Sequence, residues 1–108
     1  MTLIAPLFFK LLIGHFIADY PLQGEFLAKA KNHKLPLPGV PFYQALLAHA
    51  SIHAGMVWAI TGSGLLAVGE LLLHSLIDYL KCAGRASFNQ DQVAHAICKL
   101  VYAIIVVI

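Results

Sequence analysis

The feature that most constrains this chain is a stripe of ionisable side chains within an apolar segment. Glu70, His74 and Asp78 are spaced four residues apart in the run from Gly69 to Lys81, whose other members are almost all apolar. Residues four apart lie above one another on an α-helix, so these three side chains share one helix face, and no polar face lies opposite. A solvated surface helix is not built in this way.

The composition favours a membrane protein. Hydrophobic residues make up 60% of the 108 residues and charged residues 11%, with a mean hydropathy of +0.81. A soluble domain carries about a quarter charged residues, so this chain has too few to cover its surface. The length allows a single domain, residues 1–108, and a net charge of +2 without a dense basic run gives no sign of nucleic-acid binding.

Four long apolar segments predict an all-α fold, a polytopic membrane protein with a four-transmembrane-helix bundle. Each segment is close to the ~20 residues that cross a hydrocarbon layer. Residues 22–31 alternate apolar and charged positions, which predicts a short interfacial segment after the first helix. Helix ends are expected at Pro21, at the turn 62–64, and at Asn89, an N-cap residue with Gln92 three positions on. The predicted helices span about 3–20, 41–61, 65–81 and 90–108.

Basic residues in the connections predict the orientation. The second connection has no charge, whereas the first and third carry Lys29, Lys31, Lys34, Lys81 and Arg85. The positive-inside rule then places both basic connections in the cytoplasm and both termini outside. The sequence therefore predicts a multi-pass protein of the cytoplasmic (inner) membrane.

This orientation brings four ionisable pairs to one depth. The members of each pair are four residues apart, so they point in one direction from one helix. Because successive helices run in opposite directions, every pair falls in the cytoplasmic half of the bundle. The pairs are His15/Asp19, His49/His53, His74/Asp78 and Asp91/His95.

Imidazoles and carboxylates that converge from neighbouring helices suit a divalent transition metal, with zinc expected. One buried histidine alone is more often a hydrogen-bonded core residue, but four coincident pairs favour a ligand role. An aspartate near the membrane centre costs about 2.5 to 3.5 kcal/mol on insertion and needs a cation partner. A single zinc ion takes three or four protein ligands, so the larger pool indicates two ions or supporting members. The expected metal ligands are His15, Asp19, His49, His53, His74, Asp78 and His95.

Two further carboxylates within the long helices, Glu70 and Asp91, are the expected catalytic groups. A carboxylate that binds no metal can accept a proton from metal-bound water. For Glu70, a structural ion pair with Lys10 and Lys99 about one helical turn deeper is at least as good an interpretation. Asp91 can instead support the ligands, as can its neighbour Gln92. A further histidine at position 33, in the polar loop, is expected to be exposed to solvent.

Several motifs together resemble those of a known family. They are Gly14-His15-x-x-Ala18-Asp19-x-x-Leu22-Gln23, the His49/His53 pair, His74-x-x-x-Asp78-Tyr79-x-Lys81 and Asp91-Gln92-x-x-His95. As a set they are similar to a family of small bacterial and phage membrane proteins known only as a domain of unknown function. The resemblance covers nearly the whole chain. It implies a multi-helix membrane protein with a polar histidine and aspartate centre, and it implies no activity.

Three functional hypotheses fit these observations. The first is a membrane-embedded, metal-dependent hydrolase that acts on a lipid or another substrate reached from the cytoplasmic side. The second is transport of a metal ion or proton, against which the outer half of the bundle offers few polar groups. The third is a non-catalytic, phage-type membrane factor whose polar centre specifies helix packing. The expected partners are the lipid bilayer, such a substrate, and further copies of the chain in a homo-oligomer.

Overall fold

The structure, a computed structural model that describes residues 3–108, contains five α-helices. They are α1 (Ile4–Asp19), α2 (Gly24–Ala30), α3 (Phe42–Thr61), α4 (Gly64–Cys82) and α5 (Phe88–Val107). No strand occurs in this described range, so the all-α prediction is confirmed. The four long helices begin and end within two residues of the predicted positions, and α2 lies inside the predicted interfacial segment.

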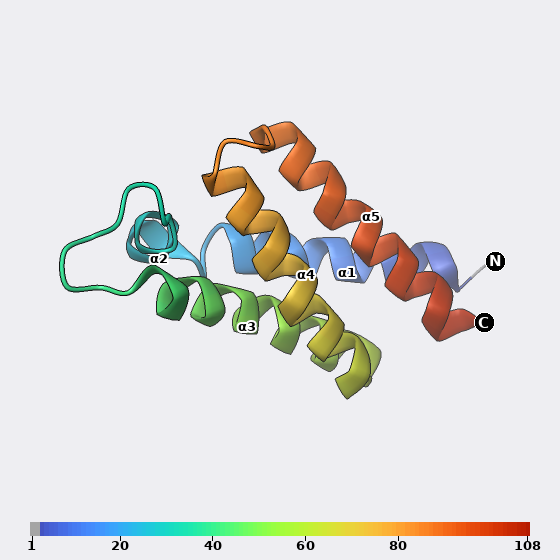
Figure 1. The fold of residues 1–108 in the computed structure, drawn as a ribbon. Helices are drawn as coiled ribbons and strands as arrows, with labels where there is room; N and C mark the ends of the chain where they lie inside the picture. The colour runs from blue at the N-terminus through green and yellow to red at the C-terminus, as the bar shows by residue number, and fades with distance from the viewer. Residues whose placement is uncertain (1–2) are drawn as a thin grey trace.

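The helices form an elongated bundle with extents of 48 × 24 × 22 Å. The most extensive packing is between α3 and α4, while α1 contacts α3 and α5, α4 contacts α5, and α2 contacts α3. The connections around α2 and between α4 and α5 lie toward one end of the bundle (Figure 1). The start of α1, the end of α5 and the turn between α3 and α4 lie toward the other end (Figure 1).

The turn between α3 and α4 follows from two residues. Gly62 has a left-handed φ of 72°, which glycine adopts without a steric penalty, and its N–H donates to the Trp58 carbonyl at 2.8 Å. Ser63 then caps α4, because its hydroxyl accepts a hydrogen bond from the Leu66 N–H at 3.1 Å. Such a short connection forces α3 and α4 to be antiparallel neighbours.

The N-cap of α5 is Ser87, and the prediction of Asn89 was wrong. The Ser87 hydroxyl accepts from the Gln90 N–H at 3.1 Å, and the Gln90 side chain accepts from the Ser87 N–H at 2.9 Å. Ser87 and Asn89 are each followed three residues later by glutamine, so the sequence holds two overlapping capping signals. The second glutamine, Gln92, bonds to Asp19 in the bundle interior and is therefore not available to cap the helix.

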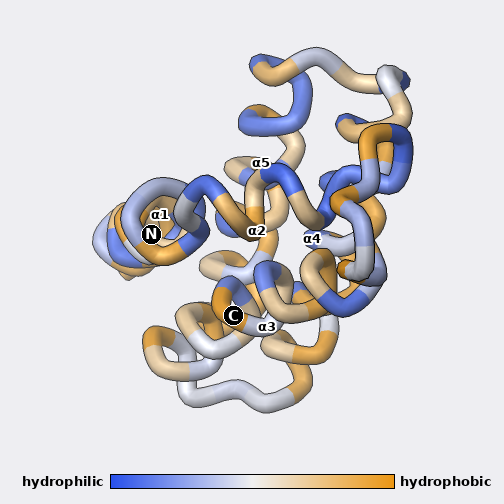
Figure 2. Tube along the Cα trace, turned by 90° about the vertical axis from the view of Figure 1, so that its left-hand side faces the viewer, coloured by the Kyte–Doolittle hydropathy of each residue, from blue (hydrophilic) through white to orange (hydrophobic). Residues whose placement is uncertain are grey.

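The interior of the bundle is polar and its exterior is apolar. Ten hydrophobic and ten polar or charged residues are buried, while many large aliphatic and aromatic side chains are exposed on the helices. Along the helices, hydrophilic residues occur between hydrophobic ones, as the colours of the Cα tube show (Figure 2). An apolar core is confined to Leu11, Val57, Tyr102 and Ala103. Half of the buried residues are thus polar or charged, a larger share than is usual in the interior of a soluble protein.

One described helix, α5, is long and apolar enough to cross a membrane, with a mean hydropathy of 1.3. α1 has 16 residues, fewer than the ~20 that span a bilayer. α4 is long enough but contains three charged residues, Glu70, Asp78 and Lys81. One such helix is weak support for membrane association, and the four predicted crossings stay a prediction.

The cap of α5 yields a direct test. Ser87→Ala should lower the free energy of unfolding by about 1 kcal/mol, because two N–H groups of the first turn lose their reciprocal partners. Asn89→Ala, two residues away on an exposed position, should change it by less than about 0.5 kcal/mol. Chemical denaturation followed by circular dichroism measures both. A larger loss for the Asn89 variant would contradict the observed start of the helix.

Candidate metal centre

Ionisable side chains from the four long helices meet in the middle of the bundle. All of them are at most 2% exposed apart from Asp19, whose side chain is 12% exposed. On each helix they are four residues apart, so adjacent turns present them to the same point. We call this set the central cluster; it consists of His15, Asp19, His49, His53, Glu70, His74, Asp78, Asp91 and His95. Every predicted ligand and both predicted catalytic carboxylates are thus brought together.

Asp19 joins three helices. Its Oδ1 lies 3.0 Å from His53 Nε2 and 3.2 Å from His49 Nε2, both on α3. Its Oδ2 lies 3.3 Å from His15 Nε2 on its own helix. Gln92 of α5 donates a hydrogen bond to the same Oδ2 at 3.0 Å. One carboxylate therefore contacts α1, α3 and α5.

Asp78 joins four helices in the same manner. Its Oδ2 lies 3.4 Å from His49 Nε2 and 3.4 Å from His74 Nε2, and its Oδ1 lies 3.3 Å from His95 Nε2. The Lys31 ammonium group, at the end of α2, donates to Oδ2 at 2.8 Å. His49 stands between the two aspartates, since its Nε2 contacts both.

Three of the five histidine rings are stacked, and several ring nitrogens have no hydrogen-bond partner. The His53 and His74 rings stack at 3.7 Å, and the His74 and His95 rings at 4.1 Å. Both nitrogens of His49 and of His74 are buried without a hydrogen-bond partner, as is Nδ1 of the other three rings. A buried, unpaired polar atom costs about 1 to 3 kcal/mol. Imidazole nitrogens in this state are suited to bind a metal.

The separations between ligand atoms fit a metal centre. Zinc binds imidazole nitrogen and carboxylate oxygen at about 2.0 to 2.2 Å, so two ligands of one tetrahedral ion are about 3.3 Å apart. The contacts around both aspartates fall between 3.0 and 3.4 Å. Three sets with ligand atoms within 4.8 Å of one another are Asp19/His49/His53/His74, His15/His74/His95 and Asp78/Asp91/His95. These sets include every predicted metal ligand.

Glu70 lies beside the ligands but is engaged in an ion pair of its own. Its Oε2 accepts a hydrogen bond from Lys99 Nζ at 2.6 Å, and its Oε1 accepts one from the Tyr102 hydroxyl at 2.9 Å. Glu70 and Lys99 are each 1% exposed. The ion pair with Lys99 is the alternative that the sequence left open. Lys10, expected in the same group, is exposed instead.

Asp91, unlike Glu70, has a carboxylate oxygen that accepts no hydrogen bond. Its Oδ1 is buried without a hydrogen-bond partner and lies 3.3 Å from His95 Nε2, while Oδ2 accepts from Gln92 Nε2 at 3.1 Å. The Gln92 carbonyl oxygen lies 3.1 Å from His15 Nε2. Gln92 therefore links Asp91 to His15 and Asp19 of α1, and the supporting role expected for it stays a prediction.

Sequence reasoning missed two members of the polar interior. Lys31 was expected to be a loop charge, yet it is 5% exposed against Asp78. Nothing in the sequence separates it from Lys29, which is exposed and pairs with Glu25 at 2.7 Å. Tyr102 did carry a signal, because it follows Lys99 by three residues and continues the inward face of α5.

His33 is half-buried, so the prediction of a solvent-exposed histidine was wrong. Its ring stacks on Tyr79 of α4 with centroids 3.9 Å apart and planes 5° apart, and Phe42 lies nearby at 5.6 Å. This stacking holds the loop after α2 against α4. The three candidate metal sets do not include His33.

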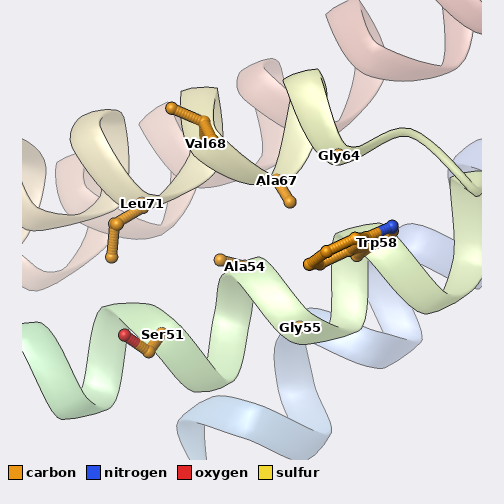
Figure 3. A pocket seen from close by; sticks show the side chains of 8 residues that line it. All are labelled: Ser51, Ala54, Gly55, Trp58, Gly64, Ala67, Val68 and Leu71. Atoms are coloured by element: carbon orange, nitrogen blue, oxygen red, sulfur yellow. The ribbon is translucent and has the colours of Figure 1, made fainter.

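A groove of about 300 Å³ between α3 and α4 is separate from the central cluster. Ala54 and Trp58 of α3 and Ala67 and Leu71 of α4 surround it (Figure 3). Its lining includes none of the cluster residues, so it provides no route to them. The full lining is Ser51, Ala54, Gly55, Trp58, Gly64, Ala67, Val68 and Leu71.

Comparison with known proteins places the chain in a family. No curated protein and no solved structure gave a match. A family described as "Protein of unknown function (DUF3307)" matches residues 7–108, a range that includes the whole central cluster. The resemblance seen in the motifs is thereby confirmed at the level of a domain of unknown function. The chain belongs to the DUF3307 family.

Proposed function

We propose that this protein binds one or two divalent transition-metal ions, zinc being the expected one, and acts as a membrane-embedded, metal-dependent hydrolase. The observation that carries the proposal is the convergence of five buried imidazoles on two aspartates at 3.0 to 3.4 Å. These separations suit ligands of a common ion, and unpaired nitrogens remain at several of the rings.

The charges of the interior support a bound cation. Four carboxylates (Asp19, Glu70, Asp78 and Asp91) are enclosed with two ammonium groups (Lys31 and Lys99), which leaves two negative charges when the histidines are neutral. An uncompensated charge in a low-dielectric interior costs several kcal/mol. One divalent ion balances both charges. Protonated histidines are the other possible source of positive charge, and metal analysis distinguishes the two.

The chemistry follows from the groups beside the ligands. A bound metal ion lowers the pKa of its water ligand and polarises a phosphoryl or carbonyl oxygen of a substrate. Asp91 Oδ1 is buried and free of hydrogen bonds, so it is the carboxylate best placed to accept a proton. The ligand pool is large enough for a second ion, with Asp19 and Asp78 as the carboxylate centres of the two sites.

The surface supports a position in a bilayer. Large apolar side chains are exposed on all four long helices, while most charged groups of these helices, though not Lys10, are enclosed between them. Three exposed basic residues, Lys29 on α2, Lys34 and Arg85, belong to segments at one end of the bundle (Figure 1), while a fourth, Lys10, lies on α1. A multi-pass arrangement with this end in the cytoplasm satisfies the positive-inside rule. A lipid or another membrane-proximal compound is then the substrate class within reach.

Transport of a metal ion or proton is less well supported. Beyond Glu70 and Lys99 the bundle is closed by the apolar core of Leu11, Val57 and Ala103. A permeation path requires polar groups or a water-filled cavity across the membrane. A non-catalytic, phage-type membrane factor, held together by its polar centre, is the remaining alternative.

Metal content provides the first test. Protein purified in detergent without chelators should contain about one or two divalent transition-metal ions per chain by elemental analysis. Protein that is folded and free of transition metal would contradict the proposal, and would favour a packing role for the central cluster.

A pair of histidine variants tests the ligand assignment. His74→Ala should abolish metal binding and lower the free energy of unfolding by about 3 kcal/mol, because Asp78 loses its cation. His33→Phe is the matched control: it removes an imidazole but keeps an aromatic ring against Tyr79. Metal titration and thermal unfolding in detergent measure both variants. Equal metal binding by the two variants would show that His74 is not a metal ligand.

Cysteine labelling in intact cells tests the orientation. In a background without Cys82 and Cys98, Leu65→Cys at the exposed turn of α3 and α4 should react with a membrane-impermeant reagent. Asn32→Cys and Ala86→Cys, in the basic connections, should react only after the cells are permeabilised. The opposite pattern would place the central cluster in the other leaflet.

A further inference from the structure

We infer that Glu70 is a positioning residue that holds His74 in one tautomer and orientation for metal binding; the inference rests on the proposed metal centre. It reassigns a carboxylate that the sequence suggested as catalytic. The juxtaposition that carries it is a buried carboxylate that faces the Nδ1 atom of His74, one helical turn further along α4.

The His74 and His53 rings each lie between two carboxylates. Glu70 Oε2 lies 3.4 Å from His74 Nδ1, whereas His53 Nδ1, at 3.9 Å, is beyond hydrogen-bond distance. On the other side of the rings, His74 Nε2 lies 3.4 Å from Asp78 Oδ2, and His53 Nε2 lies 3.0 Å from Asp19 Oδ1. Each ring therefore stands between Glu70 and one of the two aspartates.

This arrangement matches the chemistry of a metal-binding imidazole. A histidine that binds a metal through Nε2 keeps its hydrogen on Nδ1 and donates it to an outer acceptor, often a carboxylate. That acceptor fixes the tautomer and the ring orientation. Glu70 is the carboxylate that lies on the Nδ1 side of His74, so the Nε2 lone pair of this ring faces Asp78.

The other contacts of Glu70 suit this role and oppose a role as proton acceptor. Lys99 Nζ donates to Oε2 at 2.6 Å and the Tyr102 hydroxyl donates to Oε1 at 2.9 Å, so both oxygens are occupied by donors. Lys99 also balances the charge of Glu70, so the pair adds no net charge to the ligands. Tyr102 belongs to the apolar core, so the hydrogen bonds of Glu70 end in a packed, apolar region.

A pair of charge-conserving double variants tests the inference. Glu70→Gln with Lys99→Met removes the carboxylate and its counter-ion together and leaves no unpaired buried charge. Glu25→Gln with Lys29→Met removes the exposed Glu–Lys pair of α2 as the matched control. The probe is Co²⁺, measured by competition with a chelator and by its visible absorption spectrum.

The expected result is an affinity about 10- to 100-fold weaker for the Glu70/Lys99 variant, with a changed Co²⁺ spectrum, and no change for the control. Wild-type affinity and spectrum in the Glu70/Lys99 variant would overturn the inference and leave the metal centre intact. Wild-type protein that binds no Co²⁺ would overturn the metal centre itself, and the inference with it.

If the double variant does not fold, the tautomer of His74 in the wild-type protein tests the inference. Nitrogen NMR of ¹⁵N-labelled histidine should show His74 with its hydrogen on Nδ1. Tyr102→Phe, which keeps every charge but removes one donor to Glu70, should reduce the share of this tautomer. A wild-type His74 with its hydrogen on Nε2 alone would overturn the inference.

Discussion

Two aspartates, Asp19 and Asp78, hold the five helices together, and the rest of the structure depends on how their charge is compensated. Between them they contact side chains from all five helices, through imidazoles, one amide and the Lys31 ammonium group. A carboxylate removed from water is unstable unless cations or hydrogen-bond donors surround it. The inward-facing polar residues therefore supply the donors and cations that these two carboxylates require.

Much of this arrangement could be predicted from spacing alone. Pairs four residues apart fix the direction of two side chains on a helix, and a turn as short as 62–64 fixes α3 and α4 as antiparallel neighbours. Together these constraints bring the predicted ligands to one level, as the central cluster shows. The all-helical fold followed from the long apolar segments. Apolar length alone did not establish the crossings, because α1 is short at 16 residues and α4 carries three charged residues.

The features that could not be predicted depend on tertiary contacts. Lys31 enters the interior only because α2 folds back toward α4, and no local pattern distinguishes it from the exposed Lys29. The start of α5 was misplaced because Gln92, which would have completed a capping box with Asn89, is drawn to Asp19 at 3.0 Å. In both cases a buried carboxylate requires hydrogen-bond donors. This requirement selects one of two residues or capping signals that the local sequence does not distinguish.

The most direct test of the metal centre is X-ray absorption spectroscopy at the zinc edge of the zinc-loaded protein. The account predicts only nitrogen and oxygen ligands at about 2.0 to 2.2 Å, with the outer-shell scattering of several imidazole rings. A sulfur ligand at about 2.3 Å would contradict it, because zinc would then be bound by Cys82 or Cys98 outside the central cluster. A spectrum of hydrated zinc without imidazole scattering would contradict it equally.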